Sequence, residues 1–202
     1  MTKIKLCGLT QPQDIAAANE LHPDYIGLVF AEKSRRRVTP QQAAGLKSSL
    51  SPEIPAVGVF LNNPPEEIVS LCRDGIIDII QLHGTEDEDY LTRLRRLTDK
   101  PIIRAFVIRS VEDIRKAEDS SADLVLLDGG TGDGTVFDWQ LLHRIRRPYF
   151  LAGGLNPENV ADAVKNLHPF AVDVSSGIET EGKKDYDKMK AFLNAVRKEE
   201  VK

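Results

Sequence analysis

Short apolar segments alternate with helical segments eight times along this chain of 202 residues. Near-continuous apolar runs of this kind are typical of parallel strands that are buried on both faces. The alternation therefore predicts an α/β fold, a single (β/α)8 TIM barrel that forms one domain over residues 1–202. An open, doubly wound sheet is the alternative.

The boundaries of these segments follow from the apolar runs and from the turn residues between them. The expected strands are Ile4–Cys7, Tyr25–Phe30, Ala56–Leu61, Ile77–Leu82, Ile102–Val107, Leu124–Leu127, Tyr149–Ala152 and Ala171–Val174. The expected helices are Gln13–Glu20, Pro40–Ser48, Pro65–Arg73, Glu86–Leu97, Val111–Glu118, Trp139–Arg144, Pro157–Asn166 and Tyr186–Lys198. Two of these helices carry clear start signals, Thr39 before Pro40 and Asn156 before Pro157.

Small residues follow each of the last two expected strands. Gly153 and Gly154 come after the seventh strand, and Ser176 and Gly177 come after the eighth. Backbone N–H groups in such loops can face an anion without a Cβ atom in the way. Loops at these two places are where a (β/α)8 barrel commonly holds a phosphate group. The substrate is therefore expected to be a phosphorylated small molecule.

Charge and cysteine content exclude several classes of function. The chain has 27 Lys and Arg against 31 Asp and Glu, a net charge of −4, so neither a nucleic-acid nor a membrane partner is expected. Its first residues lead into a strand and do not resemble a signal peptide. Cys7 and Cys72 form neither a disulfide framework nor a metal motif. These features favour a reduced, cytoplasmic enzyme.

Polar side chains stand where several expected strands end. Period-two alternation places Lys5 and Cys7 on one face of the first strand, and Gln81 and His83 on one face of the fourth. Asp128 ends the sixth strand in the same way. In a barrel these ends surround the active site. A lysine one pleat below a thiol can lower the pKa of that thiol, so Lys5 is expected to act on Cys7 in this way.

At this point the chain resembles the phosphoribosylanthranilate isomerase family, through motifs in matching order along nearly its whole length. These are Lys5-Leu6-Cys7-Gly8-Leu9-Thr10, Gly27-Leu28-Val29-Phe30, Ser34-Arg35-Arg36-Arg37-Val38, Val57-Gly58-Val59-Phe60-Leu61-Asn62, Ile80-Gln81-Leu82-His83-Gly84, Leu126-Leu127-Asp128, Phe137-Asp138-Trp139, Ala152-Gly153-Gly154-Leu155-Asn156-Pro157-Glu158-Asn159-Val160 and Asp173-Val174-Ser175-Ser176-Gly177-Ile178-Glu179. The resemblance implies a (β/α)8 barrel, no cofactor, and an Amadori rearrangement of N-(5-phosphoribosyl)anthranilate, a phosphosugar.

This rearrangement needs one acid and one base on opposite walls of the pocket, and it requires no metal. The acid protonates the ring oxygen of the sugar, and the base removes a proton from the adjacent sugar carbon. The resemblance implies that Asp128 is the acid and Cys7 the base. Taken without the motifs, a strand cysteine is more often an inert core residue, and a strand-end aspartate is commonly a cap.

The resemblance also implies roles in substrate binding. Arg36 is expected to meet the anthranilate carboxylate, since a guanidinium fork fits a carboxylate with two parallel hydrogen bonds. Gln81 and His83 are expected to line the pocket, with His83 contacting either the substrate or only a structural partner. Asp173, on the neighbouring strand, is a geometric candidate to orient Lys5.

The segment after Asp128 is shorter than in many relatives and rich in glycine, which predicts a mobile lid. Asp133 within it is a weaker candidate for the acid.

Two alternatives stay open. One is a bifunctional isomerase that also acts in histidine biosynthesis; its second phosphate site is not evident after Asn62. The other is a non-catalytic phosphosugar-binding barrel, which the presence of Cys7 and Asp128 disfavours. The oligomeric state is open between a monomer and a homodimer.

Overall fold

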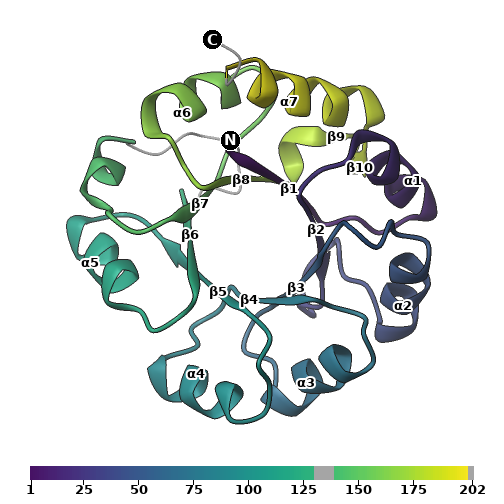
Figure 1. The fold of residues 1–202 in the computed structure, drawn as a ribbon, viewed down its shortest axis with the longest axis vertical. Helices are drawn as coiled ribbons and strands as arrows, with labels where there is room; N and C mark the ends of the chain where they lie inside the picture. The colour runs from purple at the N-terminus through teal and green to yellow at the C-terminus, as the bar shows by residue number, and fades with distance from the viewer. Residues whose placement is uncertain (130–138, 200–202) are drawn as a thin grey trace.

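The barrel is closed. The computed structural model describes residues 1–129 and 139–199, and in it eight parallel strands pair in sequence order while the last pairs with the first (Figure 1). The strands are β1 (Lys3–Cys7), β2 (Tyr25–Val29), β3 (Ala56–Phe60), β4 (Ile79–Leu82), β5 (Ile102–Val107), β6 (Leu124–Asp128), β7 (Tyr149–Ala152) and β8 (Ala171–Val174). The predicted (β/α)8 barrel is confirmed, and the alternative of an open sheet is wrong.

Helices surround the barrel on its outer side (Figure 1). They are α1 (Pro12–Leu21), α2 (Pro40–Ser48), α3 (Pro65–Arg73), α4 (Glu88–Arg95), α5 (Val111–Asp119), the 3-10 helix η1 (Trp139–Arg144), α6 (Val160–Leu167) and α7 (Tyr186–Glu199). Between β8 and α7 lie a short 3-10 turn, η2 (Ser176–Ile178), and a hairpin of β9 (Glu179–Thr180) and β10 (Lys183–Lys184). Among the described residues, no helix is long and apolar enough to cross a membrane.

Apart from shifts of one or two residues at the ends of several elements, three elements differ from the sequence prediction. Trp139–Arg144 forms a 3-10 helix where an α-helix was expected, a geometry common in short helical pieces. The helix expected from Pro157 begins at Val160, because the Asn156 side chain accepts hydrogen bonds from the N–H groups of residues 158 and 159, both at 3.0 Å, and holds a turn there. The hairpin after β8 was not expected, since strands of two residues carry no periodic signal.

Alternating residues along the strands divide the core into two layers. One layer packs between the strands and the helices. The other fills the inside of the barrel and consists of Tyr25, Val57, Ile103, Leu126, Phe150, Ala152 and Ala171. Nearer the carboxyl ends of the strands, Cys7 packs with Val29, Ala31 and Val59. Apolar side chains therefore fill the barrel interior toward the amino ends of its strands, and the pocket described below lies toward their carboxyl ends.

A repeated contact fixes the opposite end of the barrel. Three aspartates that precede even-numbered strands each accept a hydrogen bond from a backbone N–H at the start of the strand before. The pairs are Asp24 with Ile4 at 2.9 Å, Asp78 with Ala56 at 2.8 Å, and Asp123 with Ile102 at 2.8 Å. Each carboxylate thus ties two neighbouring strands together where both begin.

We predict that Asp78→Ala lowers the free energy of unfolding by about 1–3 kcal/mol, because the buried N–H of Ala56 loses its acceptor. The exposed Asp99 is the matched control, and Asp99→Ala is expected to change stability by less than about 0.5 kcal/mol. Urea unfolding of both variants measures this difference. Equal stability of the two variants would contradict the role assigned to these aspartates.

Candidate active site

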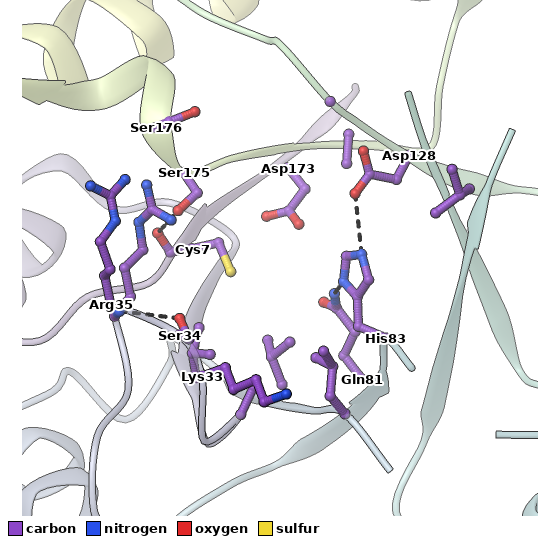
Figure 2. A pocket seen from close by; sticks show the side chains of 18 of the residues that line it. Cys7, Lys33, Ser34, Arg35, Gln81, His83, Asp128, Asp173, Ser175 and Ser176 are labelled. Atoms are coloured by element: carbon purple, nitrogen blue, oxygen red, sulfur yellow. Dashed lines mark hydrogen bonds and ion pairs between the residues drawn. The ribbon is translucent and has the colours of Figure 1, made fainter. Parts of the chain in front are cut away.

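A pocket of about 1060 Å³ opens at the carboxyl ends of the barrel strands. Eight of the nine predicted site residues line it, namely Cys7, Arg36, Gln81, His83, Asp128, Gly153, Gly154 and Ser176. Figure 2 shows Cys7 and Asp128 on opposite sides of this pocket, with Asp173 between them. The ninth residue, Gly177, does not line the pocket; a Cβ atom there would overlap the carbonyl oxygen of Leu155, so the turn after β8 needs glycine at this position.

Cys7 lies beside a buried ion pair. The Nζ atom of Lys5 is 2.9 Å from Oδ1 of Asp173, so the expected contact between these two residues is present. The Lys5 side chain is completely buried, and 8% of the Asp173 side chain is exposed. Gly27 on the adjacent strand leaves room for the thiol, since a Cβ atom there would lie 2.6 Å from Sγ of Cys7.

The environment of Cys7 raises the pKa of its thiol. Burial is the largest cause, and the Asp173 carboxylate adds to it. Lys5 and Lys184 act in the opposite direction without overcoming the effect of burial. Lys5 therefore lowers the pKa of Cys7, as predicted. The pKa of Cys7 is nevertheless raised overall, because burial has the larger effect. In the free protein Cys7 is mainly a thiol at neutral pH.

Burial alone would lower the pKa of Lys5, but the charge of Asp173 and the hydrogen bond to it act against burial, and the pKa of Lys5 is raised. Lys5 therefore stays a cation in the barrel interior. A fixed positive charge next to the sulfur favours the thiolate whenever it forms.

Asp128 is held by His83, which is held in turn by Gln81. Nε2 of His83 is 3.1 Å from Oδ2 of Asp128, and Nδ1 is 2.9 Å from the amide nitrogen of Gln81 (Figure 2). The amide N–H of Gln81 donates a hydrogen bond to Nδ1, so the proton of the neutral ring is on Nε2. The Nε2–H group then donates a hydrogen bond to the carboxylate of Asp128. Of the two roles considered for His83, the structural hydrogen bond is present, and the ring also lines the pocket.

The amide oxygen of Gln81 is an unpaired hydrogen-bond acceptor within the described part of the chain. The Gln81 side chain is buried. Because a buried acceptor without a partner is unfavourable, this oxygen is a natural contact for a donor group of a bound substrate.

Arg36 forms a fork-to-fork contact with Glu179 on β9. Nε and Nη2 of Arg36 donate to the two carboxylate oxygens at 2.6 and 2.8 Å. Nζ of Lys184 on β10 donates to the same carboxylate at 2.7 Å. Burial would raise the pKa of Glu179, but the hydrogen bonds from Arg36 and Lys184 outweigh it and lower that pKa to about 2. Glu179 is therefore ionised throughout the physiological range.

The glycine loops after β7 and β8 present free N–H groups. Gly153 and Gly154 have φ values of +94° and +68°, a backbone conformation that strongly favours glycine. A Cβ atom at Gly153 would lie 2.8 Å from Oδ1 of Asp128, so this glycine also leaves room for the carboxylate. Within the described residues, the backbone N–H groups of Gly154, Ser176 and Gly177 make no hydrogen bond. Such donors suit an anion.

The sequence analysis assigned no role to three residues of this site. Glu179, Lys184 and Ser175 connect Arg36 to Cys7: Nζ of Lys184 is 2.9 Å from the carbonyl oxygen of Ser175, whose hydroxyl donates to the carbonyl oxygen of Cys7 at 3.1 Å. Glu179 ended a recognised motif, yet nothing in the sequence identified Arg36 as its partner.

Two further predictions concern the proposed lid and the absence of a metal. Asp133, the weaker candidate for the acid, and the rest of its proposed lid lie outside the described residues. Among the described residues, no cluster of three or more His, Cys, Asp or Glu side chains is arranged to hold a metal ion.

A thiol and a carboxyl group lie across one pocket from each other at the carboxyl ends of the strands of a (β/α)8 barrel, the place where enzymes of this fold carry their active sites. Comparison with known proteins identifies the family. The family model for N-(5'-phosphoribosyl)anthranilate (PRA) isomerase matches residues 4–195. An N-(5'-phosphoribosyl)anthranilate isomerase from Endomicrobium trichonymphae is 45% identical and covers 98% of this chain and 99% of its own. A relative of the same name from Thermoanaerobacter sp. (strain X514) is 42% identical, with 98% of each chain covered.

Solved structures agree. Phosphoribosyl anthranilate isomerase from Thermotoga maritima superposes with a TM-score of 0.89 at 35% identity, over 98% of this chain and 100% of the other. A structure of the enzyme in complex with reduced 1-(o-carboxyphenylamino)-1-deoxyribulose 5-phosphate gives a TM-score of 0.87, at the same identity and coverage. The chain belongs to the N-(5'-phosphoribosyl)anthranilate isomerase family.

We predict that the alkylation of Cys7 by iodoacetamide accelerates with pH, with a midpoint above the ordinary thiol value of about 8.5. Burial raises the pKa of this thiol, so the thiolate appears only in alkaline solution. Lys5→Met should move the midpoint higher still, because Lys5 favours the thiolate. Mass spectrometry in a Cys72→Ala background follows Cys7 alone. A midpoint near neutral pH would contradict the assigned effect of burial.

Proposed function

We propose that this protein converts N-(5'-phosphoribosyl)anthranilate into 1-(2-carboxyphenylamino)-1-deoxyribulose 5-phosphate, the isomerisation step of tryptophan biosynthesis, with Asp128 as the acid and Cys7 as the base. Membership of the family is the support for this reaction. The observation that carries the two roles is the placement of Asp128 and Cys7 on opposite sides of one pocket (Figure 2).

The first step opens the sugar ring. Asp128, which must enter this step as the neutral acid, gives its proton to the ring oxygen, the bond from that oxygen to C1 breaks, and the nitrogen lone pair forms a protonated imine. His83 then donates its Nε2–H to the carboxylate that remains. A charge-assisted hydrogen bond of this kind is stronger than one to the neutral acid, so it favours the transfer.

The second step needs Cys7 as a thiolate. In the free protein burial opposes that state, but the protonated imine brings a positive charge into the pocket and lowers the pKa of nearby acids, so that Cys7 releases its thiol proton to solvent. The base therefore becomes effective after the ring has opened. Cys7 removes the proton from C2, and the resulting enolamine tautomerises to the ketone of the product.

The remaining predicted residues bind the two anionic ends of the substrate. We place the phosphate at the loops of Gly153, Gly154, Ser176 and Gly177, where free backbone N–H groups support an anion site. Arg36 receives the anthranilate carboxylate with the edge of its guanidinium that Glu179 does not occupy. The sugar between them lies over Gln81 and His83, and the unpaired amide oxygen of Gln81 accepts a hydrogen bond from a sugar hydroxyl.

Removal of either proton-transfer group should abolish turnover while leaving binding nearly intact. We expect Cys7→Ala and Asp128→Asn each to lower kcat by about 10²–10⁴-fold in an assay with N-(5'-phosphoribosyl)anthranilate, with little change in product affinity. Cys72→Ala and Asp133→Asn are the controls and should retain most activity. A Cys7→Ala enzyme within a few-fold of the parent excludes that base, and an inactive Asp133→Asn enzyme would identify a different acid.

Arg36→Met should weaken binding of the product about tenfold or more, because a hydrogen bond to a charged group contributes about 1.5–3 kcal/mol. Arg36→Lys should recover only part of this loss, since the planar fork is missing. Inhibition by inorganic phosphate serves as the control and should stay unchanged, because the phosphate binds at the glycine loops. If phosphate inhibition disappears while the product still binds, Arg36 belongs to the phosphate site.

A further inference from the structure

The side chain of Arg36 is held at its guanidinium and packed along its aliphatic part. Its Nε–Nη2 edge is occupied by the Glu179 carboxylate, with both hydrogen bonds shorter than 2.9 Å. On the other side its aliphatic part passes over Gly8, where a Cβ atom would lie 2.5 Å from Cδ. A long side chain with little freedom has already lost the rotamer entropy that binding would otherwise remove.

The carboxylate of Glu179 is held in place by Lys184. Nζ of Lys184 donates to Oε1 of Glu179 and to the carbonyl oxygen of Ser175, at 2.7 and 2.9 Å. The side chains of Glu179 and Lys184 are only 9% and 3% exposed, whereas that of Arg36 is 24% exposed. Of these three, Arg36 alone lines the pocket. Glu179 and Lys184 of the hairpin therefore form a buried support behind one partly exposed cation.

This support leaves the Nη1–Nη2 edge of Arg36 for a ligand. Within the described residues, Nη1 makes no hydrogen bond. A second carboxylate fits such an edge with two parallel bonds. The charges of Arg36, Glu179 and Lys184 sum to +1, so the cluster still attracts an anion.

We propose that Glu179, held by Lys184, is a positioning residue that orients the Arg36 guanidinium to receive the carboxylate of the anthranilate group. This inference rests on the proposed function, since it takes that carboxylate as the ligand of Arg36. Glu179 touches no substrate atom and acts only through Arg36.

Charge and orientation make opposite predictions for the loss of Glu179. If Glu179 merely reduced the local positive charge, its neutralisation would strengthen the binding of any anion. If it orients Arg36, neutralisation frees the guanidinium, and binding must then order a long side chain. Such ordering weakens affinity by about two- to tenfold.

The test measures two ligands by calorimetry, the product and the same compound made from aniline, which lacks the carboxylate. The ratio of their affinities isolates the contact with Arg36. We expect Glu179→Gln to reduce this ratio by about two- to tenfold, to raise KM by a similar factor, and to leave kcat nearly unchanged. Glu181→Gln and Lys183→Met are matched controls on the same hairpin, where both residues are exposed, and should leave the ratio unchanged.

Glu179→Gln leaves Lys184 buried beside a neutral amide, which is unfavourable for folding. The double variant Glu179→Gln/Lys184→Met removes both charges and keeps the net charge of the cluster at +1. It should show the same reduced ratio, since orientation is lost while charge is not. A ratio that is unchanged or increased in these variants overturns the positioning role.

The wild-type protein separates this result from a failure of the proposed function. If it turns over N-(5'-phosphoribosyl)anthranilate and prefers the carboxylate-bearing ligand, an unchanged ratio in the variants counts against Glu179 alone. If it shows no turnover or no preference, the proposed substrate or its placement at Arg36 is wrong, and the inference about Glu179 fails with it.

Discussion

The ion pair between Lys5 and Asp173 lies at the seam where the barrel closes. Lys5 on β1 and Asp173 on β8 are register partners in the ladder that joins the last strand to the first. A charge so deeply buried is tolerated only with a partner, and removing one member of such a pair typically costs about 3–5 kcal/mol. The same pair lies beside Cys7. A contact between the first and last strands of the barrel therefore also contributes to the electrostatic environment of the proposed base.

The base and the acid are placed in contrasting environments. Cys7 is buried, and burial raises the pKa of its thiol despite two lysines nearby. Asp128 is more accessible, with 22% of its side chain exposed, and its partner His83 is held in one tautomer by Gln81. In the proposed mechanism the more accessible acid meets the ring oxygen first. The proposed base depends on the positive charge that ring opening creates, so this difference would order the two proton transfers.

Much of this arrangement could be predicted from the sequence, because period-two alternation is a local signal. It correctly placed Lys5 with Cys7 and brought Gln81, His83 and Asp128 to one pocket. It could not find the partnership of Arg36 and Glu179, which are 143 positions apart and meet only through the closure of the barrel. Nor could it give the net pKa shift of Cys7, since Lys5 is visible in the sequence whereas the extent of burial is a property of the fold.

β8 and the turns after it connect functions that are separate in chemical terms. Asp173 supports the environment of the base, Ser176 belongs to the loop assigned to the phosphate, and Glu179 holds the guanidinium assigned to the carboxylate. Ser175 joins them, because its hydroxyl donates to the carbonyl oxygen of Cys7 while its own carbonyl accepts from Lys184. A displacement of this segment would therefore move all three contacts together. Gly177 lets this segment approach the loop after β7 closely, since a Cβ atom there would overlap the carbonyl oxygen of Leu155.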